Sequence, residues 1–248
     1  MDKRKIGYSQ FGGLFVGSGV NSAFHKHDYI VAIFSLRTIF KLAIKNSRTD
    51  IDTEGILINR NIEYRLSTPS NDRTVFIHID PYSSIGISLQ GLQANYIELQ
   101  RNEFEHQINQ IENWYAQDAS NQKEIEMILN SFADKLATKY DIARKVDERI
   151  LKCLHIMSEA EEGSYNLDYI ASLAGLSSSR FSHLFKAETG CTFRDFMKNR
   201  KLSKAIGTLV QKSNLTAAAF DGGFADQPHF TNTFKRTFGI KPSESKDS

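Results

Sequence analysis

The chain has 248 residues, 40% of them hydrophobic and 24% charged, which is typical of a globular protein with one large domain or two ordinary ones. It contains no apolar run near the roughly 18 residues of a membrane span and no apolar segment of a secretion signal, so we expect a cytoplasmic protein without a membrane partner. The net charge of +2 conceals an asymmetry, because residues 176–246 hold 12 Lys and Arg against 5 Asp and Glu, a surplus that suits DNA phosphates but that chance also produces.

Residues 1 to about 95 are predicted to form short β-strands. Apolar runs rich in β-branched and aromatic residues alternate with polar turns, such as 46–50 and 69–72. The expected strands are 29–34, 38–44, 55–58, 74–79 and 85–89. Short strands at this spacing predict a sandwich or a small barrel.

The hydrophobic pattern changes near Asn95. Apolar residues then recur at steps of three and four, which predicts helices over 97–115, 125–140 and 146–157. A polar break at 118–123 separates the first two of them. We therefore expect the β region to end near residue 118 and the last helical region to begin near residue 145.

The chain repeats itself between Ala171 and Gly239. The first copy places its matching residues at Ala171, Gly175, Leu176, Phe181, Phe185, Lys186 and Gly190. The second places them at Ala219, Gly223, Phe224, Phe230, Phe234, Lys235 and Gly239. Each copy predicts a helix, a tight glycine turn and a second helix that stops at glycine. This is the helix-turn-helix layout, whose second helix enters the major groove of DNA.

Local signals agree with the repeat. Asn166, Ser177 and Asp226 are expected to cap three of the helices, since each side chain can accept a hydrogen bond from a free backbone N–H. Gly175 supplies the turn and Gly190 ends the second helix of the first unit. Phenylalanines then face the core of each unit.

Short polar and cationic side chains remain on the outer face of each second helix, and these are the expected DNA contacts. In the first unit they are Ser178, Ser179, Arg180, Ser182, His183 and Lys186. In the second they are Gln227, His229, Thr231, Asn232, Lys235 and Arg236. For each residue the alternative is a solvated face without a base contact, and the coincidence of repeat and positive charge favours DNA.

A helix over 193–209 should connect the units, with Lys201 and Lys204 available for phosphates. Such a helix spans about 25 Å. This length is near the separation of about 34 Å between successive major grooves on one face of DNA.

These residues resemble the AraC/XylS family of bacterial transcription regulators over about 145–245. Every family anchor between Ala219 and Pro242 is present: Gly-Phe, Asp-Gln, His-Phe, Phe-Lys, Phe-Gly and the proline. Ala217 and Ala218 depart from it, standing where the family prefers a polar residue and a large aliphatic one. The resemblance implies a sequence-specific regulator that binds double-stranded DNA, with RNA polymerase as a further partner.

Family members usually carry an N-terminal sensing or dimerising domain, often of cupin type. The segment 24–29 is similar to the first cupin strand and 55–64 to a later element. Tyr64 falls where that element would have its second histidine, and the preceding proline and glycine are missing. The resemblance therefore implies a degenerate cupin-like domain that senses a ligand or pairs two subunits.

A metal site would need a third ligand beside His25 and His27, which alternate on one expected strand. His78 and Asp80 are candidates, but no spacing ties them to that strand. Since phosphate loops, nucleophile elbows and zinc-protease motifs are missing too, we expect no enzyme, metal or cofactor. Two cysteines argue against a disulfide framework and are expected as buried thiols.

We therefore expect an α+β protein with three parts: a cupin-like β-barrel or sandwich over 1–118, a bridging helix over 119–144, and an all-α DNA-binding domain over 145–248. A barrel of this size can enclose a small-molecule effector, and the alternative is a dimeric barrel without a ligand. For each candidate lining residue the alternative is ordinary core. The candidates are Phe34, Phe40, Tyr64, Phe76, His78 and Tyr82. The resemblance also implies a homodimer paired through the helix 97–115, and the alternative is that this helix packs wholly within its own subunit. The other class of function is a cupin module for a ligand or protein partner, with a decayed DNA-binding domain.

Overall fold

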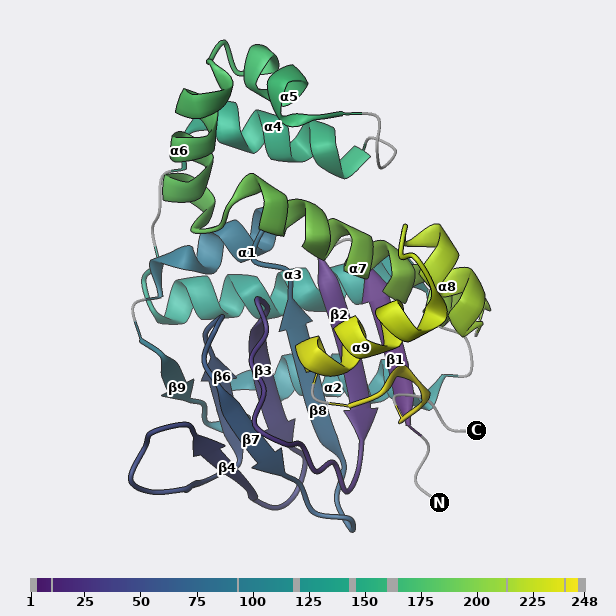
Figure 1. The fold of residues 1–248 in the computed structure, drawn as a ribbon. Coiled ribbons are helices and arrows are strands. Elements are labelled where there is room, and N and C mark those ends of the chain that lie inside the picture. The colour runs from purple at the N-terminus through teal and green to yellow at the C-terminus, as the bar shows by residue number, and fades with distance from the viewer. Residues whose placement is uncertain are drawn as a thin grey trace.

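The computed structural model describes residues 4–9, 11–92, 94–117, 121–142, 146–159, 165–212, 214–238 and 240–244. An N-terminal half of β-strands is covered by helices on one side and meets a C-terminal group of helices on another (Figure 1). This mixed architecture confirms the expected α+β class. Among the described helices, none is both long and apolar enough to cross a membrane.

Two antiparallel sheets form the N-terminal half. The larger has the order β1-β2-β8-β3-β6-β9 and the smaller the order β5-β4-β7. The strands are β1 Lys5–Ser9, β2 Gly12–Gly17, β3 Ile30–Ser35, β4 Phe40–Ile44, β5 Ile51–Thr53, β6 Gly55–Ile58, β7 Tyr64–Ser67, β8 Thr74–Ile79 and β9 Tyr96–Glu98. Side chains from both sheets share one buried core, among them Ile33, Phe40 and Leu66.

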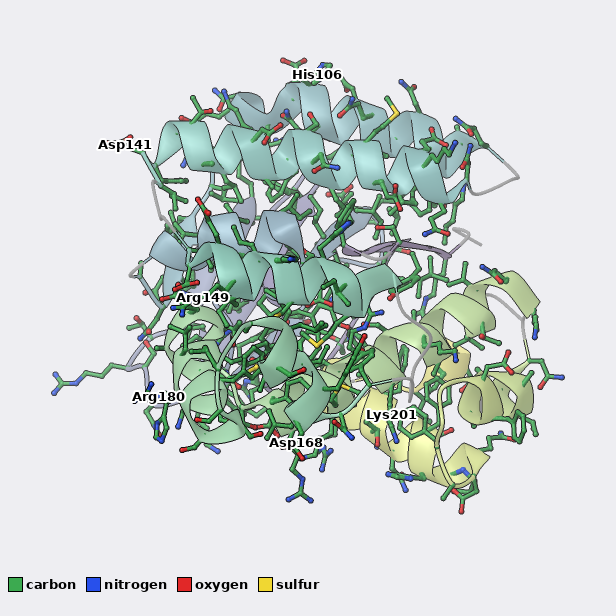
Figure 2. The ribbon with its side chains drawn as sticks, turned by 90° about the horizontal axis from the view of Figure 1, so that it is seen from above. His106, Asp141, Arg149, Asp168, Arg180 and Lys201 are labelled. Carbon is green, nitrogen blue, oxygen red and sulfur yellow. The ribbon has the colours of Figure 1, made fainter. Side chains whose placement is uncertain are left out.

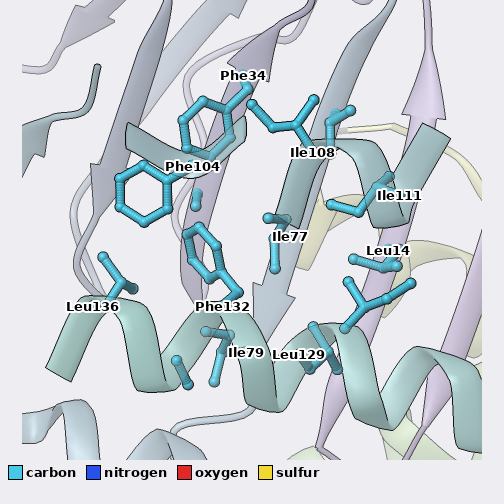
Figure 3. Packing of buried hydrophobic residues seen from close by; sticks show 14 of the residues in the cluster. Leu14, Phe34, Ile77, Ile79, Phe104, Ile108, Ile111, Leu129, Phe132 and Leu136 are labelled. Atoms are coloured by element: carbon cyan, nitrogen blue, oxygen red, sulfur yellow. The ribbon is translucent and has the colours of Figure 1, made fainter. Parts of the chain in front are cut away.

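Two helices, α2 (Glu105–Ala116) and α3 (Gln122–Lys139), cover the opposite face of the larger sheet. Because side chains alternate along a strand, β3 sends Ile33 between the sheets and Phe34 toward these helices. Phe34 stacks there on Phe104 and Phe132, with ring centroids 5.5 and 6.1 Å away (Figure 3). The predicted linker 119–144 is thus largely a helix that packs on the sheet.

Some expected elements were wrong. The run 85–89, predicted as a strand, lies mostly in helix α1 (Ser84–Ser88), because the Ser83 side chain accepts a hydrogen bond from the Gly86 amide and caps a helical turn. Ile97, predicted at the start of a helix, lies in strand β9, and the regular helix begins only at Glu105. Strands β1 and β2 were not among the predicted strands.

The C-terminal helices are α4 Glu148–Glu159, α5 Leu167–Leu173, α6 Ser178–Thr189, α7 Phe193–Lys212, α8 Leu215–Asp221 and α9 Gln227–Phe238. Short 3-10 turns occur at Leu89–Gly91, Arg101–Phe104 and Pro242–Glu244. The turn glycines Gly175 and Gly223 have φ of 66° and 67°, a left-handed conformation that side chains resist. Both predicted helix-turn-helix units, α5–α6 and α8–α9, are therefore present, with α7 between them.

Candidate nucleic-acid interface

Helix α6 is the second helix of the first unit. Its predicted cap is confirmed, since the Ser177 hydroxyl accepts from the Arg180 amide at 3.4 Å, and Gly190 ends the helix with φ of 70°. Phe181 and Phe185 are both fully buried, which turns the opposite face of α6 toward solvent. The exposed or half-exposed residues on it are the predicted set: Ser178, Ser179, Arg180, Ser182, His183 and Lys186.

Helix α9 repeats this arrangement in the second unit. Asp226 accepts from the His229 amide at 2.7 Å, as a capping residue does. Phe230 and Phe234 are buried at 0% and 3% exposure. The predicted outward residues are again exposed or half-exposed: Gln227, His229, Thr231, Asn232, Lys235 and Arg236. Gly239, predicted to end this unit, lies outside the described residues.

Cations on these surfaces have no acidic partner within the described ranges of the chain. They are Arg180 and Lys186 on α6, Lys201 and Lys204 on α7, and Lys235 and Arg236 on α9. By contrast, Lys198 and Lys212 of α7 pair with Asp195 and Asp221. Figure 2 shows Arg180 and Lys201 on the side of the molecule opposite His106 of α2. These six cations therefore lie on the helical units and the helix between them, and the two that Figure 2 labels lie away from α2.

The two second helices differ in direction. In Figure 1, α6 descends nearly vertically from α5 to α7 whereas α9 crosses the page obliquely, so their axes are not parallel. Equivalent units that enter successive major grooves on one face of straight DNA need similar orientations, because the groove repeats by translation after each turn. The arrangement of α6 and α9 does not match that requirement.

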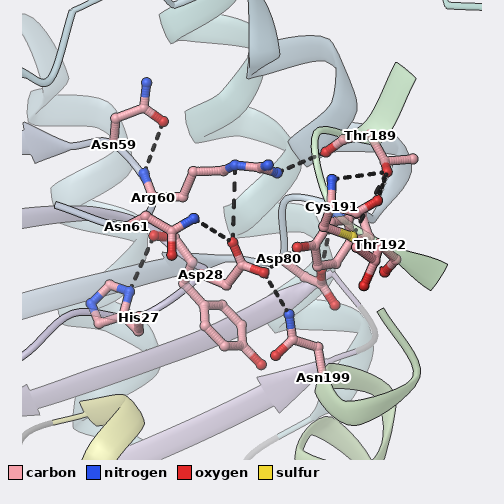
Figure 4. A network of polar contacts seen from close by, with 12 residues as sticks. His27, Asp28, Asn59, Arg60, Asn61, Asp80, Thr189, Cys191, Thr192 and Asn199 are labelled. Carbon is pink, nitrogen blue, oxygen red and sulfur yellow. Dashed lines mark hydrogen bonds and ion pairs between the residues drawn. The ribbon is translucent and has the colours of Figure 1, made fainter. Parts of the chain in front are cut away.

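Polar contacts hold the first unit against the strands (Figure 4). Arg60 donates from Nη1 to the carbonyl of Thr189, the last residue of α6, at 2.8 Å. Asp28 accepts from Nδ2 of Asn199 in α7 at 3.1 Å and from the Tyr82 hydroxyl. We call these contacts the polar joint. No sequence pattern indicated these contacts, because the partners lie far apart along the chain, and Tyr82 was predicted as an effector residue instead.

Cys191 is buried at the polar joint, with 8% of its surface exposed. Burial raises the pKa of its thiol to about 11. Cys153, buried at 1% within the core of the first unit, also has a raised thiol pKa because of burial. Both cysteines are free, as the sequence predicts.

Aromatic contacts hold the second unit. Phe238, at the end of α9, lies 5.3 Å from the His78 ring and 5.6 Å from the Tyr29 ring, measured between centroids. The Tyr29 hydroxyl also lies 3.1 Å from the Ser203 hydroxyl of α7. We call these contacts the aromatic joint. It ties the end of α9 directly to the β-strands.

A buried carboxyl, Asp80, lies near both joints. Burial raises its pKa to about 6, although the Tyr82 amide, which donates to it at 2.9 Å, and the Arg200 charge oppose the shift. Around it, burial also raises the pKa of Tyr8 and Tyr29. Among the described residues, no cluster of His, Cys, Asp or Glu is arranged to hold a metal ion.

A cavity of about 70 Å³ lies between the strands and the C-terminal helices. Tyr64, Phe76 and His78, three of the predicted effector residues, line it. The other three do not: Phe34 faces α2 and α3, Phe40 lies deeper between the sheets, and Tyr82 packs on Phe196 of α7. Sequence reasoning missed the far wall, which α7 and α9 supply.

The chain is similar in sequence to known proteins. A family model described as a helix-turn-helix domain matches residues 170–248. LumQ of Photobacterium leiognathi, a probable transcriptional regulator, is 23% identical over 236 residues, which cover 90% of this chain and 91% of LumQ. PqrA of Proteus vulgaris, a probable transcription factor, is 31% identical over 108 residues, which cover 43% of this chain and 88% of PqrA.

The fold of the whole chain also has a solved counterpart. A structure of ToxT from Vibrio cholerae with bound unsaturated fatty acid has a TM-score of 0.55, at 16% identity, over 98% of this chain and 94% of ToxT. This likeness shows a shared fold, with a β half followed by helix-turn-helix units. The chain belongs to the AraC family and is a DNA-binding transcription regulator of that type.

Proposed function

We propose that α6 and α9 read two successive major grooves of one DNA site. The observation that carries this proposal is the pair of outward faces, both built on the second helix of a capped unit and both carrying cations without an ion pair, with two exposed amides on α9. Asn232 and Gln227 suit adenine, and Arg180 suits guanine. Lys201 and Lys204 take phosphates. The domain limits proposed for this activity are 1–118, 119–144 and 145–248.

In this proposal, the conformation seen in the structure, with both joints closed, cannot place α6 and α9 in two successive major grooves at once. Its support is the direction of α9, which differs from that of α6, and the two joints that fix the units to the strands. DNA binding then requires at least one joint to open. A small-molecule effector that opens a joint would make the protein an effector-responsive regulator, and the fatty acid held by ToxT, a protein of the same fold, supports this.

We also propose that the protein forms a homodimer, contacts RNA polymerase and acts in the cytoplasm. The apolar stripe on the helix predicted to pair subunits is largely used inside the subunit, since Phe104, Ile108 and Ile111 are buried against the sheet. A dimer would therefore use the outer surface of α2 and α3, where Met127 is 67% exposed. Sedimentation of the full chain at micromolar concentration tests it, and a monomer with and without DNA contradicts it.

The test of DNA reading starts from the full chain and a random DNA library. A selected site should bind with an affinity that falls steeply with salt. Arg180→Ala and Asn232→Ala should each cost about 1–3 kcal/mol and relax specificity at one position, whereas Lys204→Ala should weaken binding to all sequences. Lys123→Ala, an exposed change on α3, is the control.

The competing function is a ligand or protein-binding module whose DNA-binding domain has decayed. It predicts that no sequence is enriched from the library. It also predicts that residual binding is equal for the wild type and for Arg180→Ala and Asn232→Ala. Either result would contradict the reading faces assigned to α6 and α9.

A further inference from the structure

The cavity of about 70 Å³ is shared by the two halves of the molecule. Strands β1, β2 and β8 supply one wall, and Ile206 of α7 with Phe234 and Phe238 of α9 supply the other. Phe234 also belongs to the buried core of the second reading unit. Whatever occupies the cavity therefore touches the β half and the DNA-reading helix at once.

His27, which lies beside the cavity, uses both of its ring nitrogens in hydrogen bonds within the protein. His27 contacts the Tyr29 carbonyl through Nδ1 at 3.1 Å, and a carbonyl only accepts, so this nitrogen carries the proton. Its Nε2 then accepts from the Tyr64 hydroxyl at 3.0 Å. Both ring nitrogens of His27 are satisfied within the protein.

Two further histidines line the cavity and keep hydrogen-bonding capacity. His25 donates from Nδ1 to the Ala23 carbonyl at 2.9 Å, so its Nε2 is an acceptor in the neutral ring. Within the part of the chain that the structure describes, this Nε2 and the His78 ring have no hydrogen-bond partner. A hydroxyl or N–H group of a ligand in the cavity could donate a hydrogen bond to this Nε2 of His25.

The cavity offers nothing to balance a charge. None of the described residues that line it is Lys, Arg, Asp or Glu. Burial lowers the pKa of His78 to about 3, helped by the nearby His25, and burial also lowers the pKa of His25. Both rings are therefore neutral at pH 7. A carboxylate would be buried without a cation, which is strongly unfavourable.

The size of the cavity decides what happens on binding. An apolar cavity that holds benzene measures about 150 Å³, so a ring-sized molecule needs more room than is present. Strand β2 is paired on both sides, with β1 and β8, and resists movement. Phe238 is half-buried at the end of α9 and meets His78 and Tyr29 only through ring contacts. Phe238 is the part of the wall that yields.

We propose that this cavity binds an uncharged, mainly apolar ring molecule with one hydroxyl or N–H group, and that its entry displaces Phe238 and frees α9 to join α6 on DNA. The proposal rests on the regulatory function given above. It names the ligand class and the direction of the response, which is tighter DNA binding when the cavity is filled.

The test uses the full chain and three probes with related rings. Indole is neutral and has an N–H donor, indene lacks the donor, and indole-3-carboxylate adds a negative charge. Titration calorimetry at pH 7.5 should show indole binding about fivefold more tightly than indene, as one neutral hydrogen bond allows. The carboxylate should bind at least about tenfold more weakly than indole.

Variants assign the effect to residues. His25→Phe should remove the preference for indole over indene, while His106→Phe, an exposed change on α2, should keep it. Phe238→Ala should bind indole several-fold more tightly, because no side chain must leave. Indole should raise the affinity of the wild type for a selected DNA site and leave that of Phe238→Ala unchanged.

Several results would overturn the inference: no heat with indole, a carboxylate that binds as well as indole, an unchanged preference in His25→Phe, or DNA binding that weakens with indole. If DNA is still selected in the first of these cases, the regulator stands and only the cavity assignment fails. If the calorimetric preferences hold but no DNA sequence is selected, the ligand site stands and the proposed DNA reading fails.

Discussion

The two helix-turn-helix units differ at matching buried positions. Ile170 in the first unit corresponds to Ala218 in the second, and both are fully buried. Ala174 of the first corresponds to Gly222, where an added Cβ would lie 2.6 Å from the Cβ of Ala205 in α7. The second unit thus has a smaller core and packs more closely on the connecting helix. It depends more on its surroundings than the first unit does.

The joints differ in chemistry as well. The first unit is held by charged and amide groups around Asp28 and Arg60, whereas the second is held by the Phe238 ring among His78 and Tyr29. Salt acts on a polar joint, and an apolar ligand acts on an aromatic one. In the proposed function, an apolar ligand therefore acts on the second unit, while the polar joint holds the first unit independently of that ligand.

The largest expected effect removes the aromatic core of either unit. Phe185→Ala and Phe234→Ala should each cost about 3–5 kcal/mol, since both rings are buried. Loss of helical circular dichroism and of DNA binding should follow. If the second unit depends more on its joint, Phe234→Ala should also loosen Phe238, whose ring lies 4.6 Å away. An unchanged melting temperature for either variant would contradict the repeat alignment.

A change at Asp80 should alter how stability responds to pH near the joints. Because burial raises the pKa of the folded state to about 6 from 3.8, the folded protein holds the proton more tightly than the unfolded chain. Its contribution to stability is therefore present below about pH 4 and is lost as the pH rises through about 6, by about 2–3 kcal/mol. Asp80→Asn should remove this loss, as measured by urea unfolding across that range.

Asp72 is the matched control for that pH effect. Burial tends to raise its pKa, but hydrogen bonds from Ser35, Thr38 and the Arg37 amide outweigh burial and lower it. Its contribution to stability is therefore present at neutral pH and is lost on acidification. Asp72→Asn should weaken the protein at pH 7, and equal pH profiles for both variants would be inconsistent with these environments.

The close packing of the second unit on α7 is tested by Gly222→Ala. The new methyl group would also meet the Lys201 carbonyl at 2.9 Å, so the change should cost about 1–3 kcal/mol. The reciprocal change in the first unit, Ala174→Gly, should cost only about 0.5–1 kcal/mol through backbone entropy. Equal losses of melting temperature would remove the proposed difference between the units.

The last prediction concerns the joints themselves. Arg60→Ala should cost about 1–2 kcal/mol, because it removes the hydrogen bond to Thr189 and the ion pair with Asp28. Hydrogen exchange should then speed up in α5 and α6 but not in α8 and α9. Phe238→Ala should give the opposite pattern. Faster exchange throughout both units in either variant would show that the joints do not act separately.

The reading units could be predicted because their signals are local. Glycines, capping side chains and phenylalanines recur within about a dozen residues, and they alone specify each unit. The sequence did not indicate which face of the sheet each side chain of β3 occupies. Every residue of β3 is buried, so no alternation of polar and apolar residues distinguishes the face of Phe34 from the other. Serine caps made the short apolar run at 85–89 helical, which hydrophobicity alone does not reveal.

The joints and the cavity could not be predicted for a different reason. Asp28 and Asn199 are separated by 171 residues, and Tyr29 and Ser203 by 174. No periodicity connects such pairs, so only the packed structure brings them together. The far wall of the cavity could not be predicted for the same reason. Phe238 was predicted in the core of its own unit, and its contact with the distant His78 and Tyr29 rings has no signal in the sequence.

The position of Cys191 at the polar joint makes its thiol a reporter of how often the joint opens. Only a thiolate reacts quickly with an alkylating agent, and burial keeps this thiol protonated and covered while the joint is closed. The labelling rate of Cys191 therefore counts how often the first unit leaves the strands. Cys153, enclosed within that unit, is labelled only when the unit itself unfolds. The ratio of the two labelling rates therefore distinguishes release of the first unit from the strands from unfolding of that unit, in a protein without substitutions.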